Sequence, residues 1–283
     1  MRWLLSVSLL VLVAAPAFGS GHGPLFGGAT PTLGKGGWQL DQAWMGRQGD
    51  RPPETDEQML RTMISFGITE DLQVSASVPI PLQSPRIFMP NGRMMSLMSA
   101  DRHVESLATW RFHRQPTGSG GRRESALIGG FSVPYEEHNP DGMLTAPSVS
   151  LAAATGYASR AHYFWVSGGY QHRMENQGDK VGDVTFASVV YGYRPRPLRL
   201  DYPKPDLRFF AEAVAERTGM ARHHGLDLLY TGGTALFVGP TALLLYKAYA
   251  LQGGMLFPVY QRTNGLPERF RFGINVSYFF WLK

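Results

Sequence analysis

The sequence predicts an all-β protein, a single transmembrane antiparallel up-and-down β-barrel of about 12 strands. Three observations predict this fold. Apolar side chains recur at every second position in one segment after another, which is the period of a β-strand. Charged and small polar side chains take the alternate positions, which a barrel in lipid turns toward its interior. The segments are joined by connections that tend to alternate between short turns and longer polar loops, as in membrane barrels.

The pattern is clearest at the end of the chain, in Arg269–Trp281. Every second residue from Phe270 to Phe280 is apolar or aromatic, with Ile274 and Val276 between rings at both ends. A strand of this length suits a tilted crossing of a bilayer, which takes about 9–11 residues. Rings at both ends of one face are typical of aromatic girdles at the two membrane interfaces. Taken alone, this segment could also be an edge strand of a soluble sandwich. The remaining segments decide between that fold and a membrane barrel.

Eleven further segments share the alternation. In chain order, the twelve predicted strands are Gly37–Gly46, Gln58–Ile68, Leu72–Pro81, Val104–His113, Ser125–Tyr135, Ser148–Tyr157, His162–Arg173, Asp183–Arg194, Asp206–Arg217, about Thr234–Tyr246, about Tyr249–Val259 and Arg269–Trp281. In the eighth strand we expect Val184, Phe186 and Val190 to face outward. A soluble barrel would instead have an apolar interior, so apolar outer faces with charged inner faces favour the membrane barrel.

The connections support the same topology. Short turns are predicted at Thr69–Asp71, Ala158–Ala161 and Lys247–Ala248, and longer polar loops follow the odd-numbered strands. The Gly-rich Arg114–Glu124 and the Pro-rich Pro195–Pro205 are predicted turns outside the sheet. An even strand count places both termini on the periplasmic side.

The N-terminus predicts export. Residues 1–19 combine Arg2, a short apolar core and small residues, which is the pattern of a secretory signal peptide. Residues 20–36 are rich in Gly and Pro and are expected to form an irregular lead, and residues 37–283 the barrel. An export signal with barrel strands indicates a Gram-negative outer membrane. The +5 net charge is dispersed, so nucleic acid is not an expected partner.

Three stretches resemble a known family: HGPLFGG at His22–Gly28, KGGWQLD at Lys35–Asp41 and LQGGMLFPVYQRTNG at Leu251–Gly265. With GITEDL at Gly67–Leu72, they are similar to outer-membrane transporters grouped as the MetA-pathway of phenol degradation type. The resemblance implies a twelve-strand barrel that takes small, often hydrophobic or aromatic, molecules across the outer membrane. Such barrels often end on an aromatic residue, whereas this chain ends on Lys283.

Inward-facing charges are the candidate lumen and substrate-path residues. They are Arg61, Glu105, Arg111, Arg173, Arg208, Glu212, Glu216, Arg269 and Arg271. A charge facing water inside a barrel is cheap, whereas Arg or Lys facing mid-bilayer lipid costs about 2–4 kcal/mol. Charged rings set selectivity in many pores. The alternative is that these residues pair with one another across the lumen and fill it.

These observations predict a passive channel for a small molecule, with outer-membrane lipids and the barrel insertion machinery as partners. No nucleotide-binding, hydrolase or metalloprotease motif is present, so we expect no catalytic residue, no cofactor and no enzyme. A structural or adhesion barrel, or a lipid-modifying barrel enzyme, is the alternative. Adjacent His223 and His224 lack the further ligands of a metal site. The methionines Met89, Met94, Met95 and Met98 more often pack than bind copper.

Overall fold

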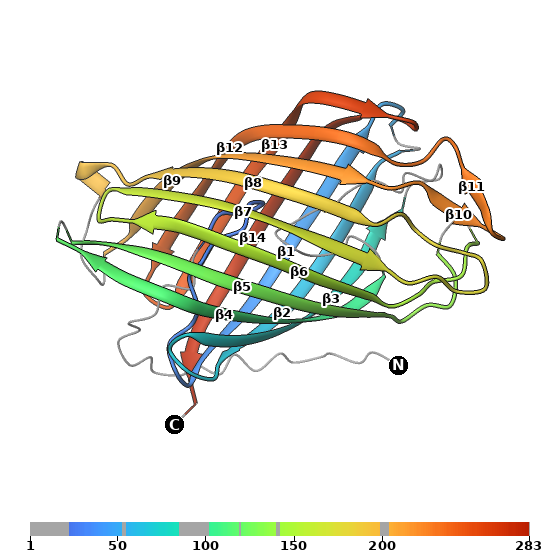
Figure 1. The fold of residues 1–283 in the computed structure, drawn as a ribbon. Coiled ribbons are helices and arrows are strands. Elements are labelled where there is room, and N and C mark those ends of the chain that lie inside the picture. Colours follow the sequence, from blue (N-terminus) through green and yellow to red (C-terminus); the bar gives the residue numbers. More distant parts are fainter. Residues whose placement is uncertain are drawn as a thin grey trace, which may run out of the picture.

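The computed structural model describes residues 23–52, 55–84, 102–118, 120–139, 142–198 and 204–282. Twelve antiparallel strands form a closed barrel, in which each strand pairs with its neighbours along the chain and the last pairs with the first (Figure 1). The predicted up-and-down barrel is therefore confirmed. Residues 1–19 and the Met89–Met98 loop lie outside the described residues, so the secretion signal stays a prediction.

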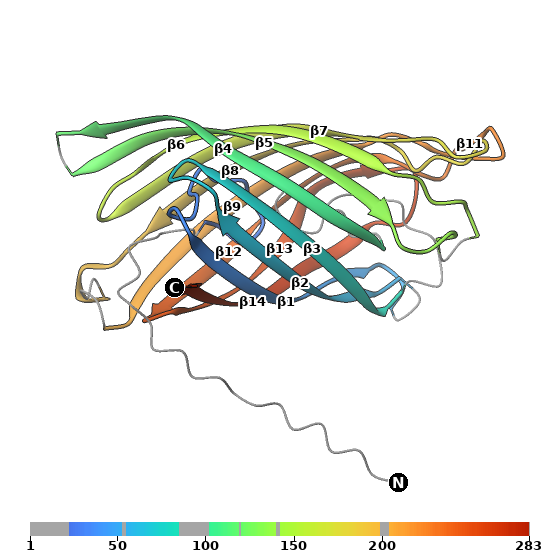
Figure 2. The ribbon, with the colours of Figure 1, turned by 90° about the horizontal axis from the view of Figure 1, so that it is seen from below.

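The strands agree with the predicted segments to within a few residues at most ends. The barrel strands are β1 Gly37–Gly49, β2 Glu57–Gly67, β3 Leu72–Gln83, β4 His103–Thr117, β5 Gly121–Pro134, β6 Ser148–Ala158, β7 His162–Arg173, β8 Val184–Tyr193, β9 Asp206–Thr218, β12 Gly233–Tyr246, β13 Tyr249–Thr263 and β14 Glu268–Trp281. A small hairpin, β10 Ala221–His223 with β11 Leu226–Leu228, occupies the predicted loop after β9. Short turns mark one end of the barrel, and β10 and β11 mark the long-loop end (Figures 1 and 2).

The outer surface of the barrel is apolar. Side chains alternate between buried and exposed along the strands, and the exposed members include Val189, Ile274 and Val276. Rings gather near the strand ends: Trp38 packs on Phe66 with ring centroids 4.6 Å apart. Among the described residues, no helix has both the length and the hydropathy needed to cross a bilayer. The exposed Val189, Ile274 and Val276 lie on the outward faces of strands.

The predicted orientation of strand eight is wrong. In β8 the side chains of Val184, Phe186 and Val190 are buried inside the barrel, and Val189 and Tyr191 are exposed outside. Both faces of this strand are apolar, so polarity does not distinguish them. The orientation follows from packing inside the barrel, where Val190 and Phe186 join clusters of other buried apolar residues.

The predicted Gly-rich turn at Arg114–Glu124 is also wrong in extent. Strand β4 continues to Thr117 and β5 begins at Gly121, so only a three-residue connection separates them. A bulge between Trp110 and His113 shifts the register, after which pairing resumes toward the hairpin end.

The interior of the barrel holds buried apolar side chains. Two apolar clusters combine strand residues such as Phe237 and Trp165 with Leu25, Phe26 and Leu33, which precede the first strand. The segment before β1 therefore contributes directly to the barrel core.

Candidate functional site

The N-terminal segment, residues 23–36, lies inside the ring of strands (Figures 1 and 2). It contains no strand or helix, and Leu25, Phe26 and Leu33 are at most 5% exposed. It is tied to the short-turn end of the barrel by the Gly36 amide, which donates to the Gly67 carbonyl at 2.8 Å. From there it extends into the lumen, where Gln252 donates to the Gly23 carbonyl at 2.8 Å.

Glu212 on β9 holds the inner part of this segment. Its carboxylate accepts the backbone amides of Leu25 and Phe26 at 2.8 Å each and of Gly27 at 2.6 Å. It also accepts the Thr241 hydroxyl at 2.6 Å. An irregular segment inside a barrel needs partners for its backbone amides, and one buried carboxylate satisfies three of them.

Glu124 on β5 anchors the segment a second time. The Thr30 hydroxyl donates to Glu124 at 3.2 Å and accepts the indole N–H of Trp165 at 3.2 Å. Glu124 is also paired with Arg111 at 3.0 Å, and Arg111 with Asp71 at 2.8 Å. The segment is therefore connected to an ion-pair network on the barrel wall.

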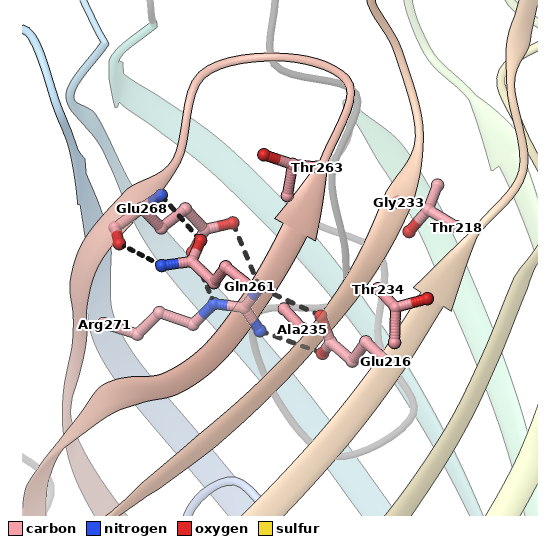
Figure 3. A pocket seen from close by; sticks show the side chains of 9 residues that line it. All are labelled: Glu216, Thr218, Gly233, Thr234, Ala235, Gln261, Thr263, Glu268 and Arg271. Carbon is pink, nitrogen blue, oxygen red and sulfur yellow. Dashed lines mark hydrogen bonds and ion pairs between the residues drawn. The ribbon is translucent and has the colours of Figure 1, made fainter.

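A second network lies toward the long-loop end of the lumen (Figure 3). Arg271 on β14 makes two parallel hydrogen bonds of 2.9 Å to Glu216 and a third of 2.7 Å to Glu268. Its guanidinium lies over the Phe237 ring, 3.9 Å from the centroid. Arg47 joins Glu268 to Glu57. Arg271, Glu216 and Glu268 border a small recess that three threonines and Gln261 also line. The recess therefore has a charged, hydroxyl and amide lining.

Gln261 closes the seam between β13 and β14 beside this recess. Backbone pairing of the two strands ends at Leu256 and Arg271, although β13 continues to Thr263. Beyond that point the Gln261 side chain donates to the Glu268 carbonyl at 2.6 Å and accepts the Glu268 amide at 2.9 Å. A side-chain amide thus replaces the missing backbone ladder.

Most of the predicted lumen residues are buried on inward faces, and most have acidic or basic partners there. Those at most 7% exposed are Arg61, Glu105, Arg111, Arg173, Glu212, Glu216 and Arg271. Arg61 interacts electrostatically with Asp41 and Glu105. Arg208 is half-buried and pairs with Asp206 at 2.9 Å. Many of these residues therefore pair with charged groups on the same strand, on a neighbouring strand or farther round the wall. A role in a substrate path, and the alternative that these pairs fill the lumen, both stay proposals.

Arg269 is the exception, because it is exposed. A register shift between Gln48 and Gly49 lets Gly49 pair with Glu268, so Glu268 rather than Arg269 takes the buried position. Strict alternation from Arg271 predicts the opposite. The bulge reverses the two side chains at this end of the strand.

Sequence reasoning missed Arg47, Glu124, Asp206 and Glu268 as lumen residues, together with the segment 23–36. Three of these residues were missed because they lie just outside the predicted ends of their strands. Arg47 lies one residue beyond the predicted first strand, Glu124 in the predicted turn and Glu268 at the end of the predicted last loop. Continuing the alternation of the first strand by one residue would have included Arg47.

Two carboxylates in the loop after β7 fasten the long-loop end. Asp183 accepts Tyr170, the Arg173 amide and Lys180. Its burial raises its pKa, but these hydrogen bonds lower the pKa by more. Burial likewise raises the pKa of Asp179, and hydrogen bonds from the amides of His224 and Leu144 and from the His223 ring bring the net pKa below its ordinary value. Both groups are therefore anionic at neutral pH.

No protein-family model matches the sequence, and no curated protein matches it. Among solved structures, the fold is similar to the COG4313 outer membrane channel from Pseudomonas putida F1, with a TM-score of 0.61 and 12% identity over 89% of this chain and 98% of that one. It is also similar to the NanC porin, with a TM-score of 0.50 and 10% identity over 84% of this chain and 98% of that one. At these identities the likeness is one of fold, the closed barrel of outer-membrane channels. The resemblance to the MetA-pathway group is not confirmed.

Proposed function

We propose that the protein is an outer-membrane channel for passive passage of a small molecule, and that the segment 23–36 limits flow through its lumen. The observation that carries this proposal is the combination of an apolar outer face with an interior that holds charged networks and an irregular segment. An apolar exterior suits lipid, and a charged interior suits a water-filled path. The fold shared with the COG4313 channel supports the same function.

The finer parts of the proposal come from the sequence. We propose export by residues 1–19, assembly by the barrel insertion machinery of a Gram-negative outer membrane, and a small hydrophobic or aromatic substrate. The apolar clusters inside the barrel contain the rings of Phe237 and Trp165, which pack with Leu25, Phe26 and Leu33. Displacement of the segment 23–36 would expose these rings to an aromatic substrate, which supports this choice. We propose no enzymatic activity.

Planar bilayers and solute-loaded liposomes test this function. We expect low conductance and measurable uptake of small aromatic solutes by the mature protein. Deletion of residues 24–33 removes the part of the segment that fills the lumen, so we expect a conductance several-fold higher. The exposed substitution Lys35→Gln at the base of the segment is the matched control and should leave conductance unchanged.

Wild type, the deletion variant and the Lys35→Gln control must first show heat-modifiable migration in gels, which reports a folded barrel. If folded wild type and folded deletion variant both gave neither conductance nor solute uptake, the channel function would be wrong. If the deletion variant conducted no better than wild type, the channel would stand and the role of the segment would fail.

A further inference from the structure

Asp179, His223 and His224 come together at the long-loop end of the barrel, although they lie in two different loops. Asp179 is in the loop between β7 and β8, and both histidines belong to the β10–β11 hairpin region. One ligand atom from each of the three side chains lies within 4.8 Å of the other two. Asp179 is the further ligand that the pair of histidines lacks in the sequence.

The backbone turns the two adjacent imidazoles to the same side. In an extended strand, consecutive side chains point to opposite faces. His224 instead has a φ of +52°, in the left-handed region, and the ring centroids of His223 and His224 are 4.0 Å apart. His224 and Gly225, whose φ is +79°, form the two-residue turn between β10 and β11, and such a turn needs positive φ at both positions. The hairpin turn therefore places the two rings side by side.

The two loops are fixed against each other independently of these side chains. The amides and carbonyls of Lys180 and Arg222 exchange hydrogen bonds of 3.0 and 2.7 Å. The Gly225 amide donates to the Gly178 carbonyl at 2.8 Å. The backbone that carries the three side chains is therefore preorganised, as a binding site requires.

The spacing of the ligand atoms suits a transition-metal ion. In a tetrahedral zinc site with bonds of about 2.1 Å, two ligand atoms lie about 3.4 Å apart. His223 Nδ1 and Asp179 Oδ1 are 2.9 Å apart. If the two atoms move apart by a few tenths of an ångström, a metal ion can take the place of the proton that they share. Asp179 is held by the Leu144 amide at 2.8 Å, which orients the carboxylate toward the imidazoles.

We propose that Asp179, His223 and His224 bind one divalent transition-metal ion, Zn²⁺ or Cu²⁺, and that the bound ion ties the β10–β11 hairpin to the loop between β7 and β8. Two imidazoles and one carboxylate are the ligand set of many zinc sites and also suit Cu²⁺. Three protein ligands leave a fourth position for water or a small anion. This site is separate from the lumen and does not depend on the channel function proposed above.

Metal binding by the folded mature protein, without a polyhistidine tag and after chelator treatment, tests the site. We expect one equivalent of Zn²⁺ by titration calorimetry, and a Cu²⁺ electron paramagnetic resonance spectrum with nitrogen hyperfine splitting. His223→Ala and His224→Gly should each weaken the affinity at least tenfold. Glycine suits the positive φ at position 224, so His224→Gly removes the imidazole without adding backbone strain.

His138→Ala, in the loop between β5 and β6, is the matched control and should bind as wild type does. Hydrogen exchange gives a second readout, because the bound ion should slow exchange of the amides in 221–228 in wild type and not in His224→Gly. Absence of stoichiometric binding to wild type would overturn the proposal. So would unchanged affinity in a His223→Ala/His224→Gly double variant that still migrates as a folded barrel.

Discussion

At the scale of single residues, Arg271 is a buried charge in the lumen that binds two carboxylates. It is 3% exposed and satisfies Glu216 and Glu268 together, so its loss would leave two buried carboxylates without their main partner. Breaking a buried pair by removing one side typically costs about 3–5 kcal/mol, because the remaining charge stays buried.

We therefore expect Arg271→Met to lower the free energy of unfolding by about 3–5 kcal/mol in urea titrations of the protein in lipid vesicles. Arg269→Met is the matched control, two residues away on the same strand. Because Arg269 is exposed, its substitution should change stability by less than about 0.5 kcal/mol. Equal losses in the two variants would contradict the assignment of Arg271, rather than Arg269, to the lumen network.

Gln261 is a second residue whose substitution gives a test, because its side chain bridges β13 to the backbone of Glu268 on β14. In Gln261→Ala the Glu268 amide loses its acceptor, so we expect that amide to exchange with deuterium about tenfold faster, equivalent to about 1.4 kcal/mol. Exchange resolved by nuclear magnetic resonance or by short peptides measures this. The exposed neighbour Arg262→Ala should leave the rate at Glu268 unchanged; an equal acceleration there would show general fraying instead.

At the scale of elements, the N-terminal segment 23–36 packs inside the barrel but is not a strand of its sheet. Its stability depends on side chains of the wall, above all Glu212. Glu212→Gln removes the negative charge and turns an amide group toward backbone N–H donors, which weakens charge-assisted hydrogen bonds. The segment should then leave its site more often.

The absence of cysteine from the chain makes this measurable, because Ala29→Cys introduces a unique label site. We expect a maleimide to label Cys at this position at least about tenfold faster in the Glu212→Gln background, since a loss of about 1.4 kcal/mol is a factor of ten. Asp206→Asn removes another lumen carboxylate that binds Arg194 and Arg208 rather than the segment. Acceleration by Asp206→Asn as large as by Glu212→Gln would contradict a specific role for Glu212.

The strands differ in how well their local sequence predicts which face points into the barrel. Alternation identified β14 and β9 with their faces, because each has one apolar and one charged side. It failed for β8, whose two faces are both apolar, and at Arg269, where a bulge reverses the facing of two residues. Local sequence settles a strand's orientation only where its two faces differ in polarity.

At the scale of the whole molecule, the apolar outer surface predicts a bilayer around the barrel, and depth should govern the cost of a charge on it. Val189 lies in the middle of β8, and Thr185 lies near the end of the same strand on the same face. We expect Val189→Arg to destabilise the barrel by about 2–4 kcal/mol in vesicles and Thr185→Arg by less than about 1 kcal/mol.

Urea unfolding in vesicles, followed by gel migration, measures both variants. The same pair in detergent micelles provides the comparison, because a micelle adapts more readily to a charge than a bilayer does. Equal costs for Val189→Arg and Thr185→Arg in vesicles would show that the outer surface does not cross a bilayer.

The sequence by itself determined the fold class, the twelve strands and the inward face of most charged residues, because a period of two is a local property of the chain. Only the tertiary structure decided which charges meet, such as Glu216 with Arg271, and that Asp179 lies beside His223 and His224. It also decided that residues 23–36 fill the lumen, where Leu25 binds Glu212 across 187 positions of sequence. These contacts join segments that are distant in the chain, and only closure of the barrel brings those segments together.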